Sequence, residues 1–183
     1  MKRIGIAGIG GIGSNVARHL AQASVPSITI VDFDLVEAAN LNRQFYQISQ
    51  QGARKTDSLA ANLKEIFPAM TIQKINQQIR PGDARSLFAD YDIVVEGLDD
   101  KRLKQMLIEE LAESETTVVS ASGIAGPEMD SVRIKKLGSC YIVGDFVSDE
   151  QHFSLFPPKV ALVASIMAGI VLKETSYAEY ITK

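Results

Sequence analysis

Four glycines near the start of the chain have the spacing of a phosphate-binding turn. Gly8, Gly10, Gly11 and Gly13 follow a short apolar stretch and precede an amphipathic one. Glycines placed in this way let the backbone turn tightly, approach a phosphate closely and point the N–H groups of a helix N-terminus at it. The alternative is a glycine-rich turn that binds nothing. The strand pattern before the glycines and the helix pattern after them favour the phosphate site.

An acidic residue follows at the distance expected of a ribose ligand. Asp32 comes 19 residues after Gly13, at the end of the apolar segment 27–31. In dinucleotide-binding folds, an acid about 20 residues beyond the glycines hydrogen-bonds the ribose hydroxyls. The alternative is a turn or capping acid. Because the spacing matches, we expect Asp32 to bind a ribose, although the spacing does not distinguish one nucleotide from another.

The loop that begins at Asp32 is richer in polar side chains than a dinucleotide requires. It reads "DFDLVEAANLNRQFY", residues 32–46. A helix N-terminus can hold a pyrophosphate, whereas a triphosphate needs added cations. We expect Arg43 and Lys55 to supply them, the alternative being solvated surface positions. The amides that would orient phosphate oxygens without adding charge are Asn40, Asn42 and Gln44.

A second acidic site is expected where the buried segment "DIVVEGL", residues 92–98, ends. Asp99 follows this segment and would lie beside the ligand crevice of a doubly wound sheet, where a carboxylate can hold Mg²⁺ directly or through water. We therefore predict that Asp99 is a metal-binding and catalytic acid. The alternative is that Asp99 or Asp100 caps the helix that follows.

The elements that would position these residues alternate between strand and helix patterns. Such alternation predicts an α/β, Rossmann-like, doubly wound and mainly parallel sheet. The segment 131–146 predicts two short strands, an antiparallel edge hairpin around Leu137–Ser139, and a helix over about Pro158–Thr175 ends the pattern. The other predicted strands are 3–7, 27–34, 70–79, 92–98 and 116–123, and the other predicted helices are 11–24, 52–68, 81–91 and 101–114.

Composition excludes several classes of protein. The 183 residues suffice for one domain, and a net charge of −3 leaves no basic footprint for nucleic acid. One Cys and two His cannot form a four-ligand structural zinc site or an internal disulfide, which favours a reducing, cytoplasmic location. The longest apolar run, 160–171, is shorter than a membrane span. We therefore expect a cytoplasmic protein that binds neither nucleic acid nor membrane.

Several ordered motifs together resemble one family. These are "GIGGIGS", the loop "DFDLVEAANLNRQFY", "GARK" and "VVEGLDD", and "SASGIAG", "YIVGDF" and "PPKVALVASIMAG" extend the likeness over nearly the whole chain. The sequence is similar to the ThiF/MoeB/HesA superfamily of ATP-dependent activators of ubiquitin-like sulfur carriers, and most similar to its short ThiF branch. The resemblance places Gly11 in the phosphate turn, Asp32 at the ribose, and Asn40, Arg43 and Lys55 at the triphosphate. It makes Asp99 the Mg²⁺ and catalytic acid.

The resemblance also implies a reaction. A single ATP-binding domain over residues 1–183 would adenylate the C-terminal glycine of a ThiS-like sulfur carrier protein in thiamine biosynthesis, release pyrophosphate and act as a homodimer. Rival functions are activation of a molybdopterin-type or cysteine-biosynthesis carrier, an NAD-dependent oxidoreductase, and a binding module without turnover. An oxidoreductase would leave Arg43, Lys55 and Asp99 unexplained, and a binding module has no use for cations that hold a triphosphate.

One feature of the sequence differs from the larger relatives, and the roles of other residues allow more than one interpretation. Those relatives carry two CxxC pairs that bind zinc, whereas this chain has a single Cys, so the resemblance implies no structural zinc here. Cys140 lies in an apolar strand pattern, where a small core residue is more common than a nucleophile. Lys159 is a candidate contact for the carrier or a phosphate. The apolar helix that contains it would be buried in the monomer or form a dimer face.

Overall fold

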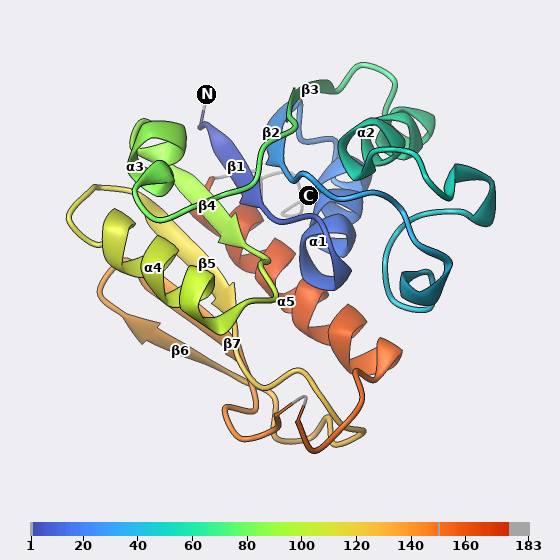
Figure 1. The fold of residues 1–183 in the computed structure, drawn as a ribbon. Coiled ribbons are helices and arrows are strands. Elements are labelled where there is room, and N and C mark those ends of the chain that lie inside the picture. Colours follow the sequence, from blue (N-terminus) through green and yellow to red (C-terminus); the bar gives the residue numbers. More distant parts are fainter. Residues whose placement is uncertain (1, 150, 176–183) are drawn as a thin grey trace, which may run out of the picture.

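The computed structural model describes residues 2–149 and 151–175, and one sheet runs through them (Figure 1). The strand order is β3-β2-β1-β4-β5-β7-β6, and every neighbouring pair is parallel except the antiparallel pair β6–β7. This confirms the predicted doubly wound sheet and its edge hairpin. The strands are β1 (Ile4–Ala7), β2 (Ser27–Val31), β3 (Thr71–Ile75), β4 (Ile93–Glu96), β5 (Thr117–Ala121), β6 (Arg133–Leu137) and β7 (Cys140–Gly144).

The helices of the described residues lie where the sequence predicts them. Helices α2, α3 and α4 are each shorter than their patterns, and β3 is only the first half of its predicted segment. The β2–β3 ladder ends at the pair Val31 and Ile75, because β2 itself ends there. The helices are α1 (Gly11–Gln22), α2 (Lys55–Ile66), α3 (Asp83–Phe88), α4 (Lys101–Leu111) and α5 (Pro157–Glu174), with two short 3-10 segments, Ala38–Asn40 and Ile48–Gln50.

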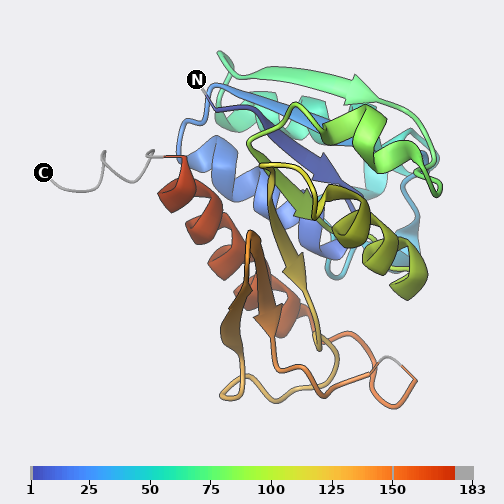
Figure 2. The same ribbon diagram turned by 90° about the vertical axis from the view of Figure 1, so that its left-hand side faces the viewer.

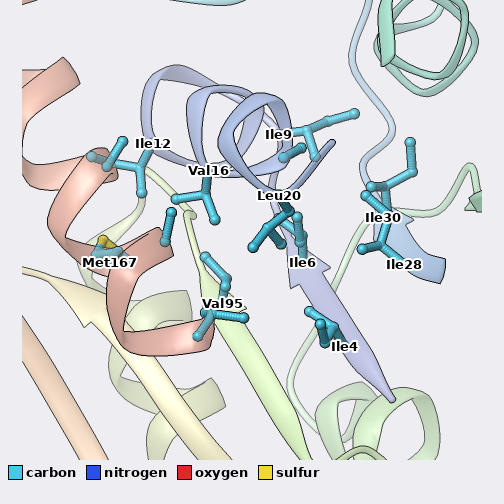
Figure 3. Packing of buried hydrophobic residues seen from close by; sticks show 14 of the residues in the cluster. Ile4, Ile6, Ile9, Ile12, Val16, Leu20, Ile28, Ile30, Val95 and Met167 are labelled. Carbon is cyan, nitrogen blue, oxygen red and sulfur yellow. The ribbon is translucent and has the colours of Figure 1, made fainter. Parts of the chain in front are cut away.

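Helices cover the two faces of the sheet (Figure 2), and a hydrophobic cluster lies on each face. Helices α1, α2 and α5 share one buried cluster, and α3 and α4 share the other. Strand β1 contributes to both clusters because its side chains alternate between the two faces of the sheet. Ile4 and Ile6 pack in the first cluster and Ala7 packs in the second. Figure 3 shows Ile6 and Val95 in the first cluster, with Met167 contributed by α5. Burial of these side chains fixes the sheet between its helices.

The strand order creates the crevice in which a ligand would lie. Strand β1 is central, with β2 on one side and β4 on the other, and the chain crosses from β3 over to β4. Helices therefore leave the ends of β1 and β4 toward opposite faces, which opens a crevice outside the carboxyl ends of these strands. Gly8 follows β1 and Gly97 follows β4. The phosphate turn and the predicted metal acid consequently face the same crevice.

Helix α5 buries one side only. Its buried residues, Val160, Val163, Ala164 and Met167 among them, pack against α1 and the sheet, whereas Leu162 is 36% exposed and Ser165 and Gly169 are exposed. Burial in the monomer thus accounts for most of the apolar residues of α5. No helix among the residues described here is long and apolar enough to cross a bilayer.

Alanine substitution at two helical glycines should change the free energy of unfolding in opposite directions. A Cβ atom on Gly13 of α1 would lie 2.0 Å from the Gly8 carbonyl oxygen, whereas one on Gly169 of α5 would meet nothing within 4 Å. We expect Gly13→Ala to lower the free energy of unfolding by about 3 kcal/mol through the backbone clash. Gly169→Ala should raise it by about 0.5–1 kcal/mol, because alanine favours helix. Urea unfolding measures both, and equal effects would contradict the close packing of α1 on β1.

Candidate active site

A cavity of about 500 Å³ opens at the carboxyl ends of the strands, within the usual size range of small-molecule sites. Its wall combines the glycine turn, the loop after β2, the start of α2 and the turns after β4 and β5. The predicted site residues that line it are Gly8, Gly10, Gly11, Asp32, Asn40, Arg43, Gln44, Lys55 and Asp99. Gly13 and Asn42 do not line it. Gly13 instead lets α1 pack closely on the turn, and Asn42 contacts Arg43.

The glycine turn is built from close backbone contacts. Gly8 has a φ of +81°, a conformation that favours glycine, and a Cβ there would lie 2.9 Å from the Gly97 carbonyl. Gly10 precedes α1 without any side-chain cap, so the first N–H groups of that helix are available to a ligand. The turn has the shape that a phosphate site requires.

Two polar residues that the sequence analysis did not single out tie this turn to the next loop. The Ser14 hydroxyl donates to the Gly10 carbonyl at 2.6 Å and accepts from the Phe45 N–H at 3.0 Å. The Asn15 amide donates to the carbonyls of Gly11 and Arg43 at 2.7 and 2.8 Å. In the sequence, nothing marks these residues except that they are polar and lie within a predicted helix. The structure shows that both are buried.

Asp32 is held in a buried, hydrogen-bonded position at the end of β2. Its side chain is 8% exposed, and its two oxygens accept the N–H groups of Ile9 and Asp34, each at 2.8 Å. Burial raises the pKa of Asp32 against the opposing effect of these hydrogen bonds. Each carboxylate oxygen can accept more than one hydrogen bond, so capacity remains for ribose hydroxyls.

The loop amides contact the arginine before any ligand is present. The Arg43 guanidinium donates to Asn42 Oδ1 at 2.9 Å and to Asn40 Oδ1 at 3.0 Å. Asn40 and Asn42 thus orient Arg43 through their side-chain oxygens. Gln44 lines the cavity, and its buried Oε1 has no hydrogen-bond partner among the described residues. Arg43 lies beside the glycine turn, its Cγ 3.7 Å from a Cβ on Gly11.

The second acid of the "DFD" stretch explains the position of Lys55. Lys55 begins α2 with 5% of its surface exposed, and its ammonium lies 2.7 Å from the Asp34 carboxylate. The Lys55 N–H also donates to the Asp34 carbonyl at 2.9 Å. Lys55 is therefore not a solvated surface lysine, because Asp34 holds it in the cavity wall.

The two acids after β4 have different surroundings. Asp100 accepts the N–H groups of Arg102 and Leu103 at 2.7 and 3.0 Å, so it is the cap of α4, and these bonds lower its pKa. Asp99 is exposed and lines the cavity. No group of three His, Cys, Asp or Glu among the described residues is arranged to hold a metal alone. Asp99 fits Mg²⁺ as one carboxylate ligand, with phosphate oxygens and waters as the others.

Comparison with known proteins identifies the family. The sequence profile of the ThiF family matches residues 1–179. The chain belongs to the ThiF family.

Named relatives of this ThiF-family chain are longer than it is. An adenylyltransferase and sulfurtransferase UBA4 of Candida glabrata is 32% identical over 177 residues, which are 92% of this chain and 41% of that protein. A ubiquitin-like modifier-activating enzyme 5 of Bombyx mori is 38% identical over 89 residues, which are 49% of this chain and 23% of that enzyme. The chain thus spans less than half the length of these relatives.

A solved structure confirms the fold. The tRNA N6-threonylcarbamoyladenosine dehydratase TcdA of E. coli, in complex with ATP, superposes with a TM-score of 0.86 at 19% sequence identity. The superposition covers 100% of this chain and 88% of that one. The likeness in fold therefore extends over all the elements that form the cavity wall.

Lys159 of this ThiF-family chain is not available to a carrier or a phosphate, which corrects its expected role. It is fully buried in α5, and its ammonium donates to Asp145 Oδ2 at 2.6 Å and to the Ala125 carbonyl at 2.7 Å. Asp145 also accepts the N–H groups of Val147 and Ser148. Lys159 and these N–H donors lower the pKa of Asp145 against its burial. The pair joins α5 to the loops after β5 and β7 that line the cavity.

Cys140 has the surroundings of a core residue. It is 9% exposed, packs in the cluster of α3 and α4, and does not line the cavity. Burial and the nearby Glu96 raise the pKa of its thiol, and a protonated thiol is a weak nucleophile.

The buried ion pair yields a stability prediction. Lys159→Met leaves the Asp145 carboxylate buried without its cation and should lower the free energy of unfolding by about 3–5 kcal/mol. The double variant Asp145→Asn/Lys159→Met removes both charges and should recover most of the loss.

Because the folded pKa of Asp145 lies below its ordinary value of 3.8, the pair stabilises the fold fully above that value. Its contribution is lost as the pH falls through the folded pKa. Urea unfolding at pH 7 tests this, and no loss in the single variant at that pH would contradict the account.

Proposed function

We propose that this chain binds Mg²⁺-ATP in the cavity and adenylates the C-terminal glycine of a ubiquitin-fold sulfur carrier. The observation that carries the proposal is the position of two held cations in the wall of the cavity that the glycine turn also lines. Arg43 is oriented by Asn40 and Asn42, and Lys55 by Asp34. A dinucleotide pyrophosphate needs no such pair, whereas a triphosphate does. ATP is accordingly the nucleotide that these residues fit.

The reaction needs little acid–base chemistry. A carboxylate oxygen of the terminal glycine attacks the α-phosphorus of ATP, a new P–O bond forms, and the bond from that phosphorus to the bridging oxygen breaks. Pyrophosphate leaves with the electron pair. A C-terminal carboxylate has a pKa of about 3.5, so it is ionised at neutral pH and requires no general base.

The side chains contribute position and charge. The N–H groups at the start of α1 and the two cations Arg43 and Lys55 hold the phosphates in line and neutralise charge that grows on the leaving group. Asp32 fixes the ribose. Asp99 is the residue that would hold Mg²⁺, which supplies further neutralisation of the phosphates when bound.

The carrier and the assembly form the finer part of the proposal. The resemblance to the short ThiF branch supports a ThiS-like carrier in thiamine biosynthesis, and carriers of molybdopterin or cysteine biosynthesis are the alternatives. The relatives named for ubiquitin-like modifier activation and for sulfur transfer support a ubiquitin-fold partner of some kind. A cytoplasmic homodimer stays part of the proposal. One ATP-binding domain over residues 1–183 also remains a prediction.

The two neighbouring acids provide a matched test. Asp99→Asn and Asp100→Asn make the same chemical change one residue apart, and asparagine still caps a helix. We expect Asp99→Asn to slow carrier-dependent ATP–pyrophosphate exchange on the order of 10²-fold, as the loss of one preorganised group does. Asp100→Asn should stay within about twofold of the unaltered protein, because only its capping role is touched.

Arg43→Ala should show a loss similar to that of Asp99→Asn in the same assay. Near-normal exchange in both variants, or equal losses in the two asparagine variants, would contradict the assignment of these residues.

A further inference from the structure

A fully buried carboxylate lies directly behind the cavity and has no role in the reaction as described above. Glu96 ends β4 and is 0% exposed. Its Oε1 accepts the Leu98 N–H at 2.7 Å, and its Oε2 accepts the Ser120 hydroxyl at 2.7 Å and the Lys104 ammonium. Glu96 therefore connects three elements of the site: the turn that carries Asp99, strand β5 and helix α4.

The full burial of Glu96 calls for a reason beyond stability. Removing a charge from water costs several kcal/mol, and well-packed apolar residues often stabilise a fold equally well. The pair lies at the carboxyl end of a central strand, where the ligand crevice of this fold lies. Lys104 lines the cavity with its side chain 23% exposed, whereas its partner Glu96 does not reach the cavity. The cation is thus the member of the pair that a ligand can meet.

Lys104 differs from the other cations of the cavity wall. Arg43 and Lys55 lie on the side of the glycine turn and the loop after β2, where the triphosphate is proposed to bind. Lys101 also lies on α4, but its side chain is 71% exposed and pairs with Asp149. Lys104 is the less exposed of the two α4 lysines, and Glu96 anchors it to the ends of β4 and β5.

We propose that Lys104 binds the carboxylate that attacks ATP and that Glu96 is the positioning residue that holds Lys104 for it. The inference rests on the proposed function and names the part of the site that receives the second substrate. A carboxylate must approach an anionic nucleotide, and the two repel each other at short range. A lysine ammonium on α4, a different part of the cavity wall from Arg43 and Lys55, would offset that repulsion. The ammonium has three N–H donors, so a bond to Glu96 leaves others for the substrate.

Binding of a short peptide tests the proposal without turnover. The probe is a hexapeptide that ends in glycine, prepared with a free C-terminal carboxylate and as the C-terminal amide. Each is titrated in the presence of Mg²⁺ and an ATP analogue with a methylene group between the α- and β-phosphorus atoms. We expect the protein to bind the carboxylate about tenfold or more tightly than the amide, the strength of a hydrogen bond between charged groups.

Four variants separate substrate binding from a structural role. Lys104→Met should abolish the preference for the carboxylate, and Lys104→Arg should keep most of it. Lys101→Met is the matched control on the same helix and should retain the preference. Glu96→Gln/Lys104→Met removes the buried charge as well, so its thermal unfolding should recover relative to Lys104→Met. The preference should remain lost in this double variant, an outcome that a purely structural ion pair does not predict.

The outcomes distinguish this proposal from the proposed function. No preference in the unaltered protein, a preference that survives Lys104→Met, or one restored in the double variant would overturn the role of Lys104. A preference that depends on Lys104, in a protein that releases no pyrophosphate with ATP and candidate carriers, would support the carboxylate site and overturn the adenylation reaction.

Discussion

The backbones of Gly8 and Gly97 approach each other more closely than residues with a Cβ atom allow. A Cβ on Gly8 would lie 2.9 Å from the Gly97 carbonyl, and one on Gly97 would lie 2.7 Å from the Gly8 oxygen. This contact joins the turn after β1 to the turn after β4, the two central strands at which the sheet changes direction. It brings the N–H groups at the start of α1 and Asp99 to one cavity. The chemistry proposed for the chain depends on this approach.

The charged groups around that contact are held in place by polar partners. Each cavity cation considered for binding is held by a polar partner: Arg43 by two asparagines of its own loop, and Lys55 and Lys104 by Asp34 and Glu96 from neighbouring elements. Preorganised charge of this kind needs little rearrangement when anions bind, and this is how electrostatic catalysis gains its strength. Lys159 is also held by a polar partner, Asp145, but it is fully buried. It therefore stabilises the wall of the cavity and cannot contact a ligand inside it.

The sequence predicts those parts of the molecule that depend on local pattern. Alternating strands and helices, the glycine turn and the hairpin around Gly138 follow from periodicity and turn chemistry, and the structure confirms these elements. Contacts between distant segments could not be read in the same way. Asp34 and Lys55 are 21 residues apart, and Lys159 and Asp145 meet only because α5 crosses the end of β7. The sequence does not distinguish a charged residue that faces solvent from one that faces a ligand or a buried partner. For this reason the expected role of Lys159 is wrong, and the sequence does not predict the buried position of Glu96.

Selective binding of a triphosphate is the central claim, and calorimetric titration with Mg²⁺-ATP, AMP and NAD tests it most directly. The account predicts saturable binding of ATP, at least tenfold weaker binding of AMP, no binding of NAD, and loss of ATP binding in Asp32→Ala. Lys55→Met should reduce the affinity for ATP toward that for AMP, because it removes a cation that only the β- and γ-phosphates need. Binding of NAD in place of ATP, or equal affinity for ATP and AMP, would contradict the account.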